Sequence, residues 1–257
     1  MADASKVPAA DQVLRILTHL AAQRGPVPAA SIASVLGLPR STTYHLLAVL
    51  QDRGFVVHLP EERRYGLGVA AFELSSGFSR QQPLTRLGRP LVANLVDRLG
   101  ESGHLAVLHG RDVLYLVEER APRRPSLVSD VGVRLPAHLT ASGRAMLQAL
   151  PPAQLRALYP DRSAFADRTP MPDAAPWTYA RLKGVLAEAR AAGAAGEHGE
   201  VTTGLASVGA PVLDHLGWPA AAIAVTFAEG SPEDLVAAAT DAVREAAATL
   251  SRRIGAR

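Results

Sequence analysis

Residues 27–53 constrain the fold of this chain more than any other stretch, because their pattern predicts two short helices joined by a tight turn. Pro28 suits the first turn of the first helix, where its missing N–H costs nothing. Gly37 follows an apolar run and is the residue type best able to adopt the left-handed conformation that ends a helix. The turn follows at once, and Ser41 is a candidate N-cap for the second helix.

The second helix has an apolar and a polar side when its residues are placed at intervals of about 100°. The inner side is predicted to hold Thr43, Leu46, Leu47 and Leu50. The outer side carries Ser41, Tyr44, His45, Ala48 and Asp52, with Arg40 and Thr42 near its N-terminal edge. A helix that offers hydrogen-bonding side chains from its N-terminal half fits the DNA major groove and can contact base edges. An ordinary helical hairpin with a polar face explains these residues equally well.

A hairpin is predicted directly after the two helices, with strands at 55–59 and 64–67. Two helices followed by such a hairpin are typical of a winged helix-turn-helix. Arginines near the tip can meet DNA phosphates, which fix the register of a protein without reading the base sequence. Glu61 and Glu62 weaken the positive field there and fit an ordinary solvated turn. The residues expected to contact DNA are Arg40, Ser41, Thr42, Thr43, Tyr44, His45, Arg63 and Arg64.

Composition excludes several classes of protein. The formal net charge of +3 is too small to argue for nucleic acid by itself, so the DNA hypothesis depends on where the charges lie. The absence of cysteine excludes disulfides, thiol catalysis and cysteine-ligated zinc. The sequence has no apolar signal core and no run of about 18 apolar residues, which indicates a cytoplasmic protein. It also lacks the motifs of zinc proteases, phosphate-binding loops and nucleophile elbows, so we expect no catalytic residue, no metal and no cofactor.

The remainder of the chain is predicted to contain several helices and, between them, strands that are joined in pairs by hairpins. The helix expected at 69–82 has a larger apolar side than one small domain needs, so we interpret it as a linker between two domains. The alternative is that this helix only covers the winged domain. The strands are expected at 104–109, 113–117, 126–131, 206–213 and 220–227. Because the strict strand–helix alternation of a parallel sheet is missing, the second domain is predicted to have a mostly antiparallel sheet.

Short motifs in both parts of the chain point to one family. The N-terminal part contains LGLPRST at 36–42, HLL at 45–47, GF at 54–55 and RYGLG at 64–68. The C-terminal part contains VGVRLPAH at 131–138, TASGRA at 140–145, Glu200, Gly204 and APV at 210–212. With these motifs the chain resembles the IclR-type transcriptional regulators over nearly its whole length. No single motif is specific, but two matched domains in the correct order are.

The resemblance implies an α+β protein with a winged helix-turn-helix at 1–68, a linker helix at 69–82 and a GAF-like effector-binding domain at 83–257. It also implies dimers, or tetramers made of two dimers, that bind palindromic operators on double-stranded DNA. The effector-binding positions that it implies are Leu139, Thr140, Ala141, Ser142, Glu197, Leu205, Ser207, Ala224 and Thr226. The chain departs from the family pattern at Leu139, where a small residue is common, at Arg144, where lysine is common, and at Ser207, where cysteine is frequent. These departures alter the size and polarity of the pocket, so no relative's ligand is carried over.

Together with the polar side of the second helix, the resemblance predicts a sequence-specific DNA-binding regulator, more often a repressor in such families, that responds to a small-molecule effector. Small residues at 140–143 leave backbone N–H groups free to hold an anion, which favours an effector with a carboxylate. A plain structural cap is the alternative for this segment. Two other classes stay open: a metabolite-binding or enzymatic domain with a vestigial DNA-binding module, and a winged domain that contacts only proteins.

Overall fold

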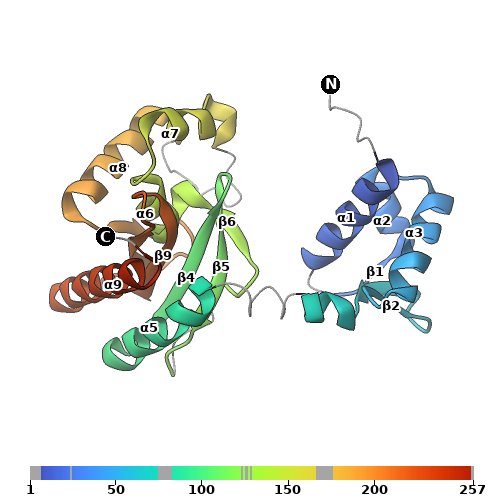
Figure 1. Cartoon of the computed structure of the whole chain (residues 1–257), viewed down its shortest axis with the longest axis horizontal. Coiled ribbons are helices and arrows are strands. Elements are labelled where there is room, and N and C mark those ends of the chain that lie inside the picture. Colours follow the sequence, from blue (N-terminus) through green and yellow to red (C-terminus); the bar gives the residue numbers. More distant parts are fainter. Residues whose placement is uncertain are drawn as a thin grey trace. The chain divides into compact units, whose positions relative to one another are not determined.

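The computed structural model of the chain describes residues 7–23, 25–74, 83–122, 124, 127, 129–165 and 176–255. It divides into two compact units, residues 1–81 and residues 82–257 (Figure 1). The first unit is largely helical with a small sheet, and the second is built on a larger sheet with helices on both faces. Within the described ranges, no helix is both long enough and apolar enough to cross a membrane.

The N-terminal unit packs three helices against a small antiparallel sheet. The helices are α1 (Pro8–Ala21), α2 (Ala29–Leu36) and α3 (Arg40–Asp52). The strands are β1 (Val27–Pro28), β2 (Val56–Leu59) and β3 (Arg64–Leu67), in the order β1-β3-β2. Their shared core consists of Ile16, Leu20, Ala29, Ile32, Leu47, Leu50 and Val56. The predicted winged helix-turn-helix is therefore confirmed, with one more strand, β1, than the sequence indicated.

The turn between α2 and α3 forms as predicted at Gly37 but not at Ser41. Gly37 has a φ of +66°, and the N–H of Leu38 donates to the carbonyl of Ala33 at 2.9 Å, which closes the end of α2. The expectation that Ser41 caps α3 is wrong, because α3 begins at Arg40 and Pro39 takes the cap position without a side-chain bond. Ser41 instead lies in the first turn and remains exposed.

The chain continues from the wing into a helix at residues 69–74. The N–H of Ala70 donates to the carbonyl of Gly54 at 3.0 Å, which ties the start of this helix to the turn between α3 and β2. Phe72 and Leu74 expose most of their side-chain surface. The rest of the expected linker helix, residues 75–82, lies outside the described residues.

The C-terminal unit is built on one six-stranded sheet with the order β6-β5-β4-β9-β8-β7. Its strands are β4 (Ser102–His109), β5 (Asp112–Glu119), β6 (Arg134–Pro136), β7 (Ala195–His198), β8 (Leu205–Leu213) and β9 (Pro219–Ala228). Every neighbouring pair in this order is antiparallel. The predicted antiparallel sheet is thus confirmed, and the hairpins β4–β5 and β8–β9 lie where the sequence pattern indicated.

Helices cover both faces of this sheet (Figure 1). One face packs against α5 (Pro83–Leu99) and α9 (Glu233–Arg253), and the other packs against α6 (Ala141–Leu147), α7 (Pro152–Leu158) and α8 (Tyr179–Ala192). We call α5 and α9 the first helical layer, and α6, α7 and α8 the second. Two 3-10 turns, η1 (Ala137–Leu139) and η2 (Arg162–Ala164), complete the second layer. Side chains alternate between the layers: Ile223 and Val225 of β9 point to the first, and Ala224 and Thr226 point to the second.

The strand expected at 126–131 is wrong. The described residues of that stretch have no strand conformation, and Val131 lies in a turn that leads into β6. Gly132 has a φ of +87° in this turn, and its N–H donates to the carbonyl of Tyr115 at 2.9 Å. Gly132 and Val133 therefore meet Tyr115 of β5 through isolated hydrogen bonds before the regular ladder begins at Leu114 and Arg134.

Candidate functional site: an exposed polar helix and a polar cavity

The N-terminal half of α3 presents polar side chains to solvent. Arg40, Ser41, Tyr44 and His45 are exposed, and Thr42 is half-buried. The opposite side of the helix carries the buried residues Leu47 and Leu50, which anchor it in the core of the unit. Because the anchoring side and the polar side are separate, the helix can contact a partner without losing its packing.

Thr43 does not belong to this exposed surface, so the expectation that it contacts DNA is corrected. Its side chain is fully buried, and its Oγ1 donates to the carbonyl of Pro39 at 3.1 Å. Thr43 lies four and seven residues before the buried Leu47 and Leu50, which places it on the inner side of α3. Its hydroxyl is therefore occupied by a hydrogen bond to the backbone inside the unit.

The two arginines of the wing are exposed but differ in their contacts. Arg63 adopts a φ of +52° in the turn between β2 and β3. The Nη1 of Arg64 donates to the carbonyl of Pro26 at 3.4 Å, which ties its guanidinium to the strand β1 side of the sheet. His58 and Tyr65 stack across the hairpin with their ring centroids 4.5 Å apart. The wing is therefore a hairpin that these contacts stabilise, and it carries the exposed guanidinium groups of Arg63 and Arg64.

The C-terminal unit contains a cavity between the start of α6 and the sheet. Its lining includes every expected effector-binding residue except Leu139, namely Thr140, Ala141, Ser142, Glu197, Leu205, Ser207, Ala224 and Thr226. Only about 30 Å³ of it is wide enough for a water-sized sphere, which is room for roughly one or two water molecules. A ligand larger than that must displace side chains or the loops around the cavity.

A row of polar side chains crosses three neighbouring strands on the cavity face. Glu197 of β7 pairs with Ser207 of β8, which pairs with Thr226 of β9. The Oγ of Ser207 donates to Oε1 of Glu197 at 2.7 Å and lies 2.9 Å from Oγ1 of Thr226. This register brings together residues that lie far apart in the sequence and gives the cavity a hydrogen-bonding side.

Glu197 is the acidic group of the cavity. Burial raises its pKa to about 7, and the negative charge of Glu200 acts in the same direction, whereas Ser207 and Arg144 oppose the shift. No hydrogen-bond partner for its Oε2 is found among the described residues. Near neutral pH the carboxyl group can therefore hold a proton and donate it to an oxygen atom of a bound molecule.

The start of α6 lies close to η1 and to the sheet because two glycines leave room for it. The N–H of Gly143 donates to Oγ1 of Thr140 at 3.0 Å, so Thr140 caps the helix. A Cβ on Gly143 would lie 2.1 Å from the carbonyl oxygen of Ala137, and a Cβ on Gly209 would lie 3.1 Å from the backbone carbon of Ala141. This close approach brings Ala141 and its neighbour into the cavity wall.

Leu139 lies elsewhere, so its expected place in the effector site is corrected. Its side chain is buried in the hydrophobic core between the sheet and the second helical layer. The 3-10 turn η1 ends at Leu139, and the backbone is extended at Thr140. The side chains of Leu139 and Thr140 therefore lie in different places, the first in the core and the second in the cavity wall. A large apolar residue at this position fills the core and leaves the cavity to the residues that follow.

Several cavity residues were not among the expected effector-binding residues. They are His104, Tyr115, Leu127, Ser129, Val201 and Thr202. Strand alternation is a signal that places His104 opposite the core residue Leu105. The residues from loops have no such periodic signal, because only the folded chain brings them to the cavity.

The two units together define a class of protein: a winged helix-turn-helix regulator whose second domain encloses a polar cavity. Two family models match the chain, the IclR helix-turn-helix domain over residues 9–60 and the bacterial transcriptional regulator IclR C-terminal domain over residues 78–252. The chain therefore belongs to the IclR family of transcriptional regulators, as the motifs predicted.

Relatives and solved structures agree with this assignment. The glycerol operon regulatory protein of Streptomyces coelicolor is 33% identical, with 98% of each chain covered. The transcriptional repressor IclR of Escherichia coli is 29% identical over 83% of this chain and 77% of that protein. The crystal structure of an IclR transcriptional regulator from Alicyclobacillus acidocaldarius has a TM-score of 0.85 at 23% identity, covering 98% of this chain and 100% of that one. These comparisons support the two-domain fold over nearly the full length.

Proposed function

We propose that this chain is a transcriptional repressor that binds a palindromic operator and is controlled by a small effector bearing a carboxylate. The observation that carries the proposal is the division of α3 into a buried side and an exposed polar N-terminal half. Two relatives, from Escherichia coli and Salmonella typhimurium, are named as repressors, which favours repression over activation. The DNA partner of such a protein lies in the cytoplasm of a bacterium, so we expect the chain to act there.

The outer side of α3 supplies the proposed base contacts. Arg40, Ser41, Thr42, Tyr44 and His45 all lie on its N-terminal half, the part of a recognition helix that enters the major groove. A bidentate contact to the correct base contributes roughly 1–3 kcal/mol of discrimination. The wing arginines Arg63 and Arg64 would meet phosphates, which adds affinity but no sequence preference.

A dimer would place two such helices in successive major grooves, about 34 Å apart along the duplex. Exposed apolar side chains in the N-terminal unit, among them Leu14 of α1 and Phe72, support a second copy of the chain as their partner. We propose that residues 69–82 join the winged domain of residues 1–68 to the effector domain of residues 83–257. An effector then changes operator binding only if it favours one dimer geometry over another.

The polar row of the cavity supports a carboxylate as the anchoring group of the effector. Glu197 in its protonated form, Ser207 and Thr226 offer hydrogen bonds from one wall, and the backbone of Ala141 and Ser142 forms the wall opposite. A structural neighbour from Microbacterium hydrocarbonoxydans, with a TM-score of 0.79 at 23% identity, was solved with 4-hydroxybenzoate. That ligand is a monocarboxylate.

The experiment is a selection of genomic fragments that the full-length protein retains, followed by titration of a retained fragment in the presence and absence of small monocarboxylates. We expect a palindromic fragment that is bound tightly and is released, or held more tightly, when the acid is added. Failure to retain any fragment would contradict the DNA-binding proposal. Turnover of the acid, followed by NMR, would contradict a purely regulatory role and favour an enzymatic domain.

A further inference from the structure

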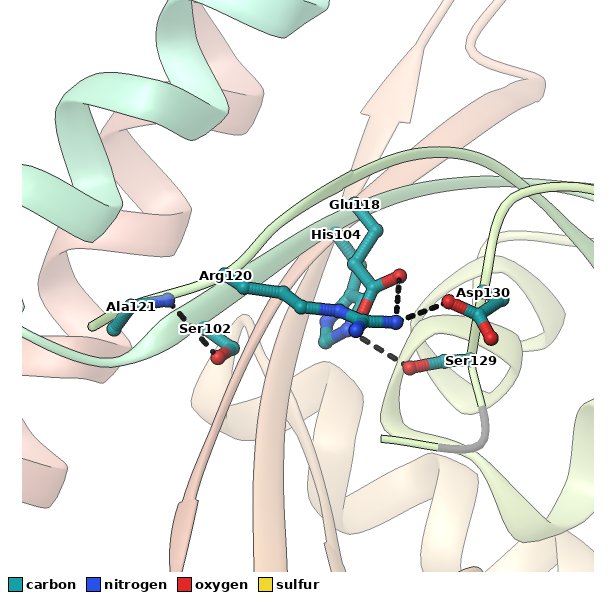
Figure 2. Close-up of polar contacts among 7 residues, drawn as sticks. All are labelled: Ser102, His104, Glu118, Arg120, Ala121, Ser129 and Asp130. Atoms are coloured by element: carbon teal, nitrogen blue, oxygen red, sulfur yellow. Dashed lines mark hydrogen bonds and ion pairs between the residues drawn. The ribbon is translucent and has the colours of Figure 1, made fainter. Parts of the chain in front are cut away.

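A second polar point lies in the effector cavity, apart from the row formed by Glu197, Ser207 and Thr226. His104 of β4 and Ser129, from the segment between β5 and β6, both line the cavity and are almost fully buried. The Nε2 of His104 lies 2.9 Å from the Oγ of Ser129 (Figure 2). The rings of His104 and Tyr115 meet edge to face at 5.6 Å, which fixes the orientation of the imidazole.

The strand register sets the separation of the two points. His104 pairs with Ala224, and Thr226 pairs with Ser102, so His104 and Thr226 are diagonal neighbours on one face of the β4–β9 pair. Diagonal neighbours in an antiparallel pair lie roughly 7–8 Å apart, with their Cβ atoms somewhat closer. A molecule with only a few heavy atoms between two polar groups can therefore reach both points.

The chemistry of the second point favours an uncharged group. Burial and the positive charge of Arg120 lower the pKa of His104 to about 4, so the imidazole is neutral near pH 7. Figure 2 shows the guanidinium of Arg120 engaged with Glu118 and Asp130, and this local group carries more negative than positive charge. A second carboxylate would lose its hydration here without gaining a free cation.

Other contacts also hold the segment that carries Ser129. The hydrogen bond between His104 and Ser129 is therefore not required for that purpose alone. Arg120 pairs with Asp130, and Arg124 pairs with the buried Glu101. The N–H of Ala121 donates to the Oγ of Ser102 at 3.3 Å. A hydroxyl such as that of Ser129 can make up to three hydrogen bonds, so it can serve His104 and a ligand together.

We propose that His104 and Ser129 form a second recognition point of the cavity, which binds an uncharged hydroxyl or carbonyl group of the effector. The effector is then a small monocarboxylate with a neutral oxygen-bearing group at its other end. This inference rests on the proposed function, because the carboxylate is taken to bind at the polar row that contains Glu197.

Three acids with the same number of carbon atoms test the inference: propionate has no second group, lactate has a hydroxyl, and malonate has a second carboxylate. Benzoate and 4-hydroxybenzoate form a larger matched pair. Their binding to the full-length protein is measured by calorimetry for the wild type, Ser129→Ala and His104→Phe, with thermal unfolding as the check of folding. Ser129→Ala removes only a hydroxyl, so the test stands even if His104→Phe fails to fold.

We expect the wild type to bind the hydroxy acid of at least one matched set roughly three- to tenfold more tightly than the acid without a hydroxyl. Malonate should bind more weakly than lactate. Ser129→Ala and folded His104→Phe should lose the preference for the hydroxyl, so that each variant binds the two acids of that matched set with nearly equal affinity. A hydroxyl preference that survives in Ser129→Ala, no such preference in the wild type, or tighter binding of malonate than of lactate would overturn this inference alone. Failure of all five acids to bind would also contradict the proposed carboxylate effector.

Discussion

Arg144 and Glu200 form an ion pair of 2.7 Å that joins α6 to the loop between β7 and β8. The guanidinium of Arg144 is buried and also donates to the carbonyls of His138 and Gly196, at 2.8 and 2.7 Å. The same loop brings Val201 into the cavity wall, and the first residues of α6 form another part of that wall. The pair therefore holds two sides of the effector cavity in a fixed relation.

Removal of this arginine should be costly. Arg144→Ala leaves Glu200 without its cation and removes the guanidinium donor from the carbonyls of His138 and Gly196, so we expect it to lower the free energy of unfolding by about 3–5 kcal/mol. Arg144→Lys should recover only part of this loss, because an ammonium group cannot reproduce the planar fork that reaches three acceptors. Urea denaturation of the purified variants measures both effects.

Arg98→Ala is the matched control, since Arg98 pairs with Glu245 at 3.3 Å on the surface of the same unit. Both side chains of that pair are more than half exposed, so the loss should be under about 1 kcal/mol. Equal losses for the Arg144→Ala and Arg98→Ala variants would show that the buried pair has no special role in stability.

Two glycines in helices of the C-terminal unit should respond in opposite ways to alanine. Gly143→Ala places a Cβ 2.1 Å from the carbonyl oxygen of Ala137, so the start of α6 must shift at a cost of roughly 2 kcal/mol or more. Gly184 of α8 has no atom within 4 Å of an added Cβ, so Gly184→Ala should stabilise by about 0.5–1 kcal/mol. Thermal unfolding of the two variants checks the signs. A neutral Gly143→Ala would mean that α6 is not packed tightly against η1.

The titration of Glu197 should make stability depend on pH. Its pKa rises from 4.5 to about 7 on folding, so the folded chain holds a proton that the unfolded chain releases between these values. This contribution is fully present below about pH 4.5 and is lost as the pH rises through about 7. Glu197→Gln should therefore gain stability relative to the wild type as the pH rises, by roughly 1 kcal/mol per pH unit inside the window.

Urea denaturation of both forms at about pH 5, 6, 7 and 8 tests this dependence. His104 and His138, whose pKa values are lowered by burial, titrate in both forms, so their effect largely cancels in the comparison. A constant difference in stability across this range would show that Glu197 stays ionised in the folded chain. The binding of a carboxylate should weaken above about pH 7 for the same reason, because the proton that Glu197 donates is then lost.

The wing should affect affinity without affecting sequence preference. If Arg63 meets a phosphate, Arg63→Ala reduces the slope of log K against log salt by about 1 and weakens all DNA sequences equally. Arg252→Ala, which removes an exposed arginine of α9, serves as the control and should leave the slope unchanged. A change in base preference for Arg63→Ala would instead indicate that the wing reads the sequence.

The sequence predicted the elements whose signals are local and periodic. Helical spacing placed Leu47 and Leu50 inside, and the same spacing placed Thr43 beside them, although Thr43 was also expected to contact DNA. The family resemblance located Glu197 and Ser207, which the register of β7 and β8 then brought together. Ser129 could not be anticipated, because it lies outside the regular strands and reaches His104 only through tertiary packing.

The central claim is that the exposed half of α3 binds operator DNA. Fluorescence anisotropy with a retained operator fragment measures this directly for the wild type and for the double variant Arg40→Ala with Tyr44→Ala. Both side chains are exposed, so the variant should keep its fold and its assembly state, as circular dichroism and size-exclusion chromatography would show. We predict that operator affinity falls by at least about a hundredfold, which corresponds to roughly 2.7 kcal/mol. Unchanged affinity of the folded double variant would contradict the assignment of this surface.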